Sequence, residues 1–316
     1  MRILVTGGAG FIGSNFVRRI LDGSLSGYSS VSVLDKLTYA GNMENLPKDG
    51  YEFIHGDICD ENLVRTLIKR HDLVVNFAAE SHVDRSIHDP KSFFNTNIQG
   101  VQNLLDAVKS VDGCKFLQIS TDEVYGSIGS GSSDENFALL PNSPYAASKA
   151  AADLIVRSYF KTYGLNVLVT RSSNNYGPNQ YPEKLIPLFI SNLIEGKRLP
   201  IYGSGENIRD WIHVDDNCNA LHAALMADNA GESYNIGGGN EFSNLAIANK
   251  IVNSMGLDSS VFDFVQDRAG HDFRYSVNAT KIKNDLGFEP VLSFSFGLLK
   301  TIDWYRENEH WWRKLK

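Results

Sequence analysis

Tyr145 and Lys149 form a Tyr-x-x-x-Lys pair near the start of a predicted helix. Four residues make about one helical turn, so we expect both side chains on one face of that helix. An ammonium group beside a phenol favours the phenolate, and Lys149 is therefore expected to lower the pKa of Tyr145. Such a tyrosine could take a proton from a substrate hydroxyl while a hydride leaves the same carbon. The alternative is an ordinary pair on a helix surface.

A glycine turn precedes this pair near the start of the chain. Gly7, Gly10 and Gly13 lie between a predicted strand and a predicted helix. Glycine permits a tight turn and a close approach of the backbone to a pyrophosphate, which the helix N-terminus meets with free N–H groups. Asp35 ends the next predicted strand, where a carboxylate accepts hydrogen bonds from a ribose 2′-hydroxyl and repels a 2′-phosphate. This pattern predicts NAD rather than NADP, and the alternative for Asp35 is a surface turn.

Two adjacent carboxyl groups follow another predicted strand. Asp122 and Glu123 come directly after Ser120-Thr121. Neighbouring residues on a straight strand point to opposite faces, so both acids can reach one substrate only if the chain bends after Ser120. In that case one carboxyl group could act as an acid and the other as a base. The alternative is a solvated turn, because charged residues are usually exposed.

These residues need elements that position them. Helical patterns cover residues 11–21, 61–70, 97–109 and 144–163. Short runs rich in Val and Ile alternate with them and predict strands at residues 3–6, 31–35, 53–54, 73–77, 116–120 and 167–171. Strands that alternate with helices indicate βαβ units, and their apolar interiors indicate a parallel sheet covered on both faces.

This alternation weakens after about residue 175. We expect an α/β fold, with a Rossmann-type doubly wound parallel sheet in residues 1–175 that binds NAD and carries the Tyr/Lys pair. A smaller α/β region in residues 176–316 would bind mainly the substrate, and the two regions would interleave. Shorter helices are predicted in this second region at residues 215–226, 244–255, 279–286 and 294–307.

Composition excludes several classes of function. The formal net charge is −7 and no long Lys/Arg run occurs, which argues against a nucleic-acid partner. Cys59, Cys114 and Cys218 form no CxxC pair, which favours free thiols in a reducing compartment and hence the cytoplasm. The N-terminal apolar run is too short for a secretory signal, and no apolar stretch is long enough to span a membrane. Metal-site spacings such as H-E-x-x-H are also absent, so no metal is expected.

Together, the glycine turn, Asp35, Thr121 and the Tyr145/Lys149 pair resemble the extended short-chain dehydrogenase/reductases. In that family a Ser or Thr, the Tyr and the Lys form the catalytic group. Residues 202–215 are similar to the segment with which the family binds sugar nucleotides. The resemblance covers essentially the whole chain.

Finer motifs resemble the dTDP-glucose 4,6-dehydratases within that family. Related epimerases typically lack an acid pair like Asp122-Glu123, and related decarboxylases and GDP-mannose dehydratases usually carry Ser-Glu there. The resemblance implies that sugar C4 is oxidised, that Glu123 removes the C5 proton and that Asp122 protonates the hydroxyl leaving C6. Hydride then returns to C6. An aspartic acid with this role needs a raised pKa, which burial and a neighbouring carboxylate both favour. The motifs are residues 78–86, 120–126, 173–178 and 182–187.

The resemblance further implies tightly bound NAD that is regenerated within each turnover. The expected catalytic residues are Thr121, Asp122, Glu123, Tyr145 and Lys149. The expected cofactor residues are Gly7, Gly10, Phe11, Ile12, Gly13, Asp35, Lys36, Leu37, Thr38, Asp57, Ile58, Phe77, Ala78, Ala79, Ser81, Thr96, Tyr145, Lys149 and Asn175. The residues expected to contact dTDP-glucose or a close analogue are Ser81, Thr121, Asn174, Lys184, Leu185, Pro200, Ile201, Tyr202, Arg209, Asn235, Asp267, Arg268 and His271.

Other interpretations remain open at this point. For Arg209 the alternative is a surface ion pair with Asp210. His82 and His213 occupy motif positions that suggest a structural role. The family forms a homodimer through helices matching residues 97–109 and 144–163. A UDP-glucose 4,6-dehydratase, or an epimerase or decarboxylase acting on nucleotide sugars, would share the fold, and an NAD-sensing binding protein would lack part of the catalytic group.

Overall fold

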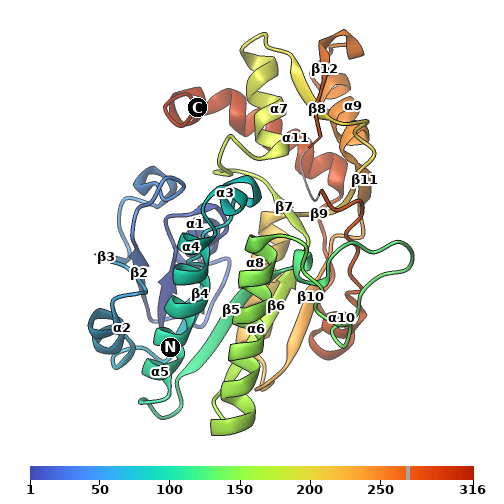
Figure 1. Ribbon diagram of the computed structural model, residues 1–316. Coiled ribbons are helices and arrows are strands. Elements are labelled where there is room, and N and C mark those ends of the chain that lie inside the picture. The colour runs from blue at the N-terminus through green and yellow to red at the C-terminus, as the bar shows by residue number, and fades with distance from the viewer. Residues whose placement is uncertain (268–270) are drawn as a thin grey trace.

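A parallel sheet forms the centre of the computed structural model, which describes residues 1–267 and 271–316 (Figure 1). Within those residues its strand order is β10-β6-β5-β4-β1-β2-β3, and every neighbouring pair is parallel. The order reverses between β1 and β4, the point at which doubly wound sheets bind ligands. The strands are β1 (Arg2–Thr6), β2 (Ser30–Asp35), β3 (Glu52–His55), β4 (Leu73–Asn76), β5 (Lys115–Thr121), β6 (Val167–Ser172) and β10 (Ser233–Ile236).

Helices cover both faces of this sheet. On one face, α1 (Phe11–Leu21), α8 (Val214–Met226) and α10 (Thr280–Leu286) pack against side chains such as Val5 and Val33. On the other face, α2 (Glu61–Ile68), α5 (Val101–Val108) and α6 (Pro144–Tyr163) pack against Leu4 and Val74. The expected doubly wound α/β fold is confirmed.

Sequence patterns located the long elements well and the short ones poorly. The predicted helix at residues 97–109 begins instead as a π-helix, Asn95–Gly100, which leads into α5. Two short helices, α3 (Val83–His88) and α4 (Pro90–Phe94), were not predicted, because five or six residues give too little periodicity to recognise. The helix α7 (Leu185–Ile194) was missed because it is apolar almost all round.

A second region lies above the carboxyl ends of the sheet in Figure 1. Its apolar core joins α7, α9 (Asn244–Ser254), α11 (Phe294–Glu307) and α12 (Glu309–Trp312). Because β10, α8 and α10 come after residue 175 yet belong to the main sheet, the chain passes repeatedly between the two regions. This region contains a sheet of β11 (Glu241–Ser243), β9 (Ile208–His213) and β7 (Asn174–Tyr176), and a pair formed by β12 (Phe262–Val265) and β8 (Leu199–Tyr202).

None of the helices within the described ranges is long and apolar enough to cross a membrane.

Candidate active site

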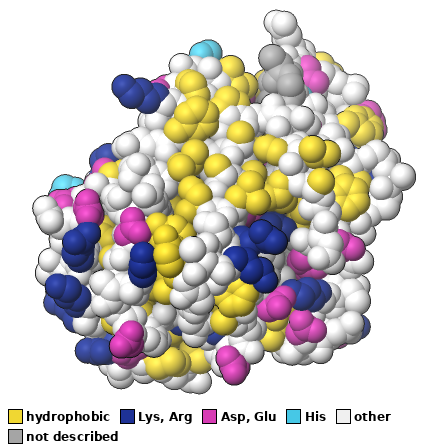
Figure 2. All heavy atoms as spheres, turned by 60° about the horizontal axis from the view of Figure 1, so that its bottom comes forward, with side chains coloured by type: hydrophobic (Ala, Val, Ile, Leu, Met, Phe, Trp, Pro, Cys, Tyr) yellow, Lys and Arg dark blue, Asp and Glu magenta, His cyan; other side chains and the backbone are white. Residues whose placement is uncertain are grey.

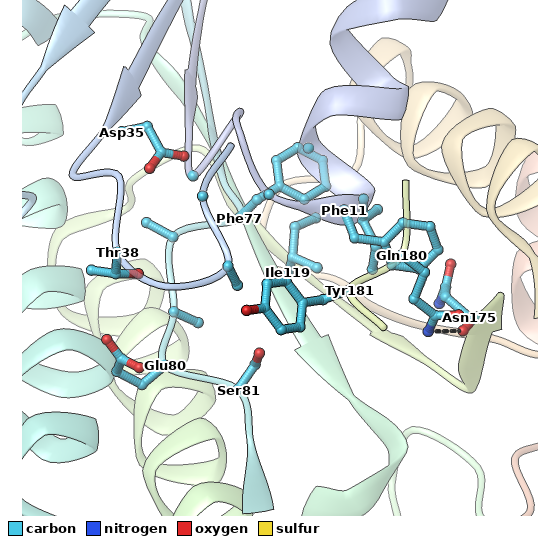
Figure 3. Close-up of a pocket in the computed structure, with 18 of the residues that line it drawn as sticks. Phe11, Asp35, Thr38, Phe77, Glu80, Ser81, Ile119, Asn175, Gln180 and Tyr181 are labelled. Carbon is cyan, nitrogen blue, oxygen red and sulfur yellow. Dashed lines mark hydrogen bonds between the residues drawn. The ribbon is translucent and has the colours of Figure 1, made fainter. Parts of the chain in front are cut away.

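A deep pocket opens at the carboxyl ends of β1, β2, β4 and β5, where the order of strands reverses. Figure 3 shows Asp35 and Glu80 at one end of this pocket and Asn175 and Gln180 at the other. The Gln180 amide donates a hydrogen bond to the carbonyl of Asn175 at 2.9 Å. Because parallel strands end at one edge, residues that are distant in sequence meet here.

The glycine turn forms one wall of the pocket. Gly7 has a φ of +67°, and a Cβ atom there would lie 2.5 Å from the backbone nitrogen of Ala78. A Cβ on Gly13 would lie 2.5 Å from the carbonyl oxygen of Gly7. Gly10 is the N-cap of α1 and has no side chain with which to satisfy the first N–H groups of the helix. The turn thus presents backbone donors and the positive end of a helix, as a pyrophosphate requires.

Asp35 is buried at the end of β2 and anchors the turn. Its Oδ2 accepts a hydrogen bond from the backbone of Ala9 at 2.9 Å, and its Oδ1 accepts one from Leu37 at 2.8 Å. A carboxylate has about four acceptor positions, so lone pairs remain for a ribose hydroxyl. Burial raises the pKa of Asp35, whereas the two backbone hydrogen bonds lower it.

Nearly all of the expected cofactor residues line this one pocket. The exception is Leu37, whose side chain packs against the hydrophobic core. Asn175 Oδ1 and Gln180 Oε1 are buried and have no hydrogen-bond partner among the described residues, so a polar ligand would complete both. The residues present therefore fit NAD. The expected residues that line the pocket are Gly7, Gly10, Phe11, Ile12, Gly13, Asp35, Lys36, Thr38, Asp57, Ile58, Phe77, Ala78, Ala79, Ser81, Thr96, Tyr145, Lys149 and Asn175.

The acid pair lies where the chain leaves the sheet. β5 ends at Thr121, and a 3-10 helix, Asp122–Tyr125, begins at once, with Thr121 Oγ1 accepting a hydrogen bond from the backbone of Glu123. This is the bend that both acids need to reach one substrate, and both line the pocket. Thr121 donates to Asp122 Oδ1 at 3.2 Å, while the buried Asp122 Oδ2 has no partner among the described residues.

Burial, followed by the charges of Glu123 and Asp210, raises the pKa of Asp122 to about 8. Asp122 is therefore largely protonated at neutral pH, as a general acid must be.

Tyr145 and Lys149 line the same pocket from α6, and both side chains are buried. Lys149 Nζ donates a hydrogen bond to the carbonyl of Ile119 at 2.5 Å, and burial lowers the pKa of Lys149 to about 8. The expectation that Tyr145 has a lowered pKa is wrong for the protein alone. Burial, followed by the charges of Glu123 and Asp122, raises the pKa of the phenol.

A second pocket adjoins the first. Ser81, Glu123, Asn174 and Lys184 line both, so the acid pair lies close to where the two pockets meet. Its other walls come from α7, from the β8–β9 region and from residues 271–275. The expected substrate residues that line it are Ser81, Asn174, Lys184, Leu185, Pro200, Ile201, Tyr202, Arg209 and His271.

Arg209 is the main buried cation of the second pocket. Its guanidinium donates to the carbonyls of Ile208 at 2.7 Å and Asp272 at 2.9 Å, and it lies 4.2 Å from the centre of the Tyr275 ring. The alternative ion pair with Asp210 is not the arrangement found, because Asp210 accepts hydrogen bonds from the backbone of Gly238 and Asn240.

Two expected substrate residues, Asn235 and Asp267, are not brought into either pocket. Two histidines cap helices. Asn235 is fully buried elsewhere, where its amide donates to Ser133 and its oxygen accepts from Tyr125. Asp267 accepts a hydrogen bond from His271 at 2.7 Å but does not line the pocket, and Arg268 lies outside the described residues. His82 accepts from the first turn of α3, and His213 accepts from the first turn of α8.

Several residues that line the pockets were not predicted. Three of them lie in or beside the motifs at 173–178 and 182–187, namely Gln180, Tyr181 and Glu183, so motifs with wider bounds would have included them. Nothing in the local sequence places Tyr275 beside Arg209, or Trp311 in the first pocket. These contacts depend on segments that are far apart in sequence.

Comparison with known proteins agrees with this arrangement. Residues 4–301 match the model of the GDP-mannose 4,6 dehydratase family. A dTDP-glucose 4,6-dehydratase from Streptomyces niveus is 53% identical over 322 residues, covering 100% of this chain and 96% of that protein. The chain belongs to the family of the dTDP-glucose 4,6-dehydratases.

Solved structures of related enzymes have nearly the same fold as this chain. The dTDP-glucose 4,6-dehydratase DesIV from Streptomyces venezuelae, solved with NAD and a second ligand, has a TM-score of 0.98 at 52% identity, with both chains covered completely. UDP-glucose 4-epimerase from Thermus thermophilus, solved with NAD, has a TM-score of 0.90 at 31% identity, covering 98% of this chain and 100% of its own. Since the two folds are so close, the residues of the site must distinguish a dehydratase from an epimerase.

Proposed function

We propose that this chain is a dTDP-glucose 4,6-dehydratase that uses tightly bound NAD. The reaction oxidises the glucose at C4, eliminates water across C5 and C6, and returns hydride to C6, giving dTDP-4-keto-6-deoxyglucose. NAD, when bound, would accept the hydride from C4 and supply it to C6. The observation that carries this proposal is the acid pair, in which a buried aspartic acid lines the first pocket beside a glutamate that lines both pockets.

Tyr145 is the proposed acceptor of the C4 hydroxyl proton. Thr121 and Lys149 would support it, because all three residues line the same part of the first pocket. Lys149 lines the pocket, and its ammonium group donates a hydrogen bond to the carbonyl of Ile119. The positive charges of this ammonium group and of bound NAD would stabilise the phenolate form of Tyr145, which is the form that can take the C4 hydroxyl proton.

Elimination needs one carboxylate and one carboxylic acid. The ketone at C4 acidifies the C5 proton, and Glu123 would remove it and return a proton to C5 when hydride is added at C6. Asp122 would protonate the C6 hydroxyl, which leaves as water. The raised pKa of Asp122, to about 8, lets it hold that proton near neutral pH.

The nucleotide diphosphate would occupy the second pocket. Arg209 is a suitable phosphate ligand because its planar guanidinium can pair with two oxygens. Pro200, Ile201 and Tyr202 line the same pocket and would meet the base and its ribose. We thus assign NAD binding to residues 1–175 and substrate binding mainly to residues 176–316.

We also infer a cytoplasmic homodimer. Large hydrophobic side chains are exposed on α4 and α6, namely Phe94, Leu154 and Tyr163. The helix α5 packs beside α6. In the proposed dimer, α5 and α6 of one copy pack against α5 and α6 of the other. Figure 2 shows hydrophobic side chains gathered in a band among charged ones on the face turned to the viewer. The cysteines are free thiols, with Cys114 and Cys218 buried, which suits a reducing compartment.

The test is to incubate the purified protein with dTDP-glucose and, separately, with UDP-glucose. We expect a product that has lost one water and that absorbs in the near ultraviolet after strong base is added. A product of unchanged mass would identify an epimerase, and loss of carbon dioxide in a third reaction with UDP-glucuronic acid would identify a decarboxylase. Faster turnover of UDP-glucose would favour the UDP-glucose 4,6-dehydratase, and no product from either nucleotide would contradict the proposal.

A further inference from the structure

The aromatic C-terminal tail, residues 308–316, reaches the cofactor pocket. In Figure 1, α11 crosses the upper part of the molecule past α7 toward the C-terminus. Most aromatic residues of α11 and both tryptophans of α12 belong to the core of the second region. However, Trp311 and Leu315 also line the pocket formed by the glycine turn. The tail therefore extends from the substrate region to the cofactor region.

A chain of hydrogen bonds links the tail to the glycine turn. The indole Nε1 of Trp311 donates to Asn45 Oδ1 at 2.9 Å, and Asn45 Nδ2 donates to the carbonyl of Ala9 at 2.8 Å. Trp311 and Asn45 are both almost completely buried. Next to this contact, Lys314 pairs with Glu44 at 2.7 Å. One buried side chain thus connects the tail to the loop that would hold the pyrophosphate.

A second contact joins the same part of the chain to another wall of the pocket. The Tyr305 hydroxyl donates to the carbonyl of Gln180, a residue that lines the pocket. Trp312 in turn donates from its indole to the carbonyl of Tyr305 at 2.7 Å. The Trp304 and Trp311 rings pack edge to face with their centres 5.0 Å apart. The C-terminal aromatic residues therefore fix two walls of the pocket relative to each other.

We propose that the aromatic tail is a positioning element that retains NAD, with Trp311 as its central residue. The inference rests on the proposed NAD-dependent function and goes beyond it. An enzyme whose cofactor is regenerated in every cycle has no need to exchange it, and a wall closed from the far end of the chain would slow its release. Loosening this wall should speed NAD release before it affects folding.

The experiment measures how fast NAD leaves the purified holoenzyme. Each variant is diluted into an excess of an NAD-consuming enzyme, and the decay of protein-bound NAD is followed. Trp311→Phe removes the indole donor but keeps an aromatic ring, and we expect release to become roughly fivefold faster, the effect of one lost hydrogen bond. Leu315→Ala, at the partly exposed edge of the same wall, should also speed release.

Phe296→Leu is the control. Phe296 lies on α11 with its ring exposed and does not line the pocket, so NAD release should stay at the wild-type rate. Thermal unfolding of all variants at saturating NAD separates loss of retention from loss of folding. Wild-type release rates in both Trp311→Phe and Leu315→Ala, or an equal acceleration in Phe296→Leu, would overturn the inference alone. A wild-type protein that binds no NAD would overturn the proposed function together with it.

Discussion

The two pockets are built in different ways. The cofactor pocket is formed by the ends of parallel strands and by glycine backbone, where a Cβ at Gly7 or Gly13 would come within 2.5 Å of another backbone atom. The second pocket is formed by α7, by short strands and by side chains such as Arg209, which three backbone carbonyls hold in place. The glycine turn of the first pocket thus depends on the absence of side chains, whereas the wall around Arg209 in the second pocket depends on their presence.

This difference separates two kinds of sensitivity. A rigid backbone wall tolerates no added atom, whereas a wall of side chains can exchange one contact for another at moderate cost. Glu123 lines both pockets and Asp122 lines the first, so the chemistry of the acid pair depends on both pockets. Substitutions in the acid pair should therefore have the largest effects, and substitutions within one pocket should have smaller ones.

Asp122→Asn should slow elimination of water by roughly 10²- to 10⁴-fold, the usual contribution of a general acid. An amide cannot supply the proton for the leaving hydroxyl, whereas oxidation at C4 should continue. Rapid-quench mass spectrometry of the bound sugar would show the 4-keto sugar accumulating before water is lost. Asp134→Asn, the same change at an exposed position in the following loop, is the control. Elimination at the wild-type rate in Asp122→Asn would refute the assignment of the acid.

The pH dependence of elimination follows from the same carboxyl group. The pKa of Asp122 is raised to about 8, so the protonated form that acts as the acid is present below pH 8 and is lost as the pH rises through that value. We expect the elimination rate of the wild-type protein to fall above about pH 8, and this decline to be absent in Asp122→Asn. The stability of the folded protein also decreases as the pH rises. The folded state holds a proton that the unfolded state has released above about pH 4, so the wild-type protein loses stability relative to Asp122→Asn between about pH 4 and 8.

Gly13→Ala tests whether the glycine turn of the cofactor pocket tolerates an added side chain. The new Cβ would lie 2.5 Å from the Gly7 carbonyl, and the turn would have to shift. Overpacking of this kind costs about 1–3 kcal/mol, so NAD affinity should fall roughly 10- to 100-fold. Calorimetric titration of the NAD-free protein measures this directly. Gly129→Ala, where a Cβ meets open space, should bind NAD normally. If Gly13→Ala also bound it normally, the backbone wall would be less restrictive than its geometry indicates.

The same difference between the pockets explains which features of the site could be predicted from the sequence. Gly7, Gly13 and Asp35 occupy fixed positions relative to adjacent strands, so local patterns placed them correctly. Asn235 was assigned to the substrate by the family resemblance, yet it is buried between Ser133 and Tyr125, because its neighbours come from distant segments. Local spacing placed Tyr145 and Lys149 on one helix face. It could not reveal that burial would raise the pKa of the phenol, since burial depends on the whole fold.

Arg209→Lys tests whether the second pocket can exchange one side-chain contact for another. It should have the smallest effect of these substitutions. Lysine keeps the positive charge but loses the planar fork and the contact with the Tyr275 ring. We expect KM for the nucleotide sugar to rise roughly tenfold, about 1.4 kcal/mol, with kcat little changed, because this contact holds the substrate both before and during the reaction. Arg65→Lys, on the exposed side of α2, controls for the change of residue type. If kcat fell as far as in Asp122→Asn while KM stayed constant, Arg209 would act on the reacting sugar, and the substrate pocket would be as intolerant of change as the cofactor pocket.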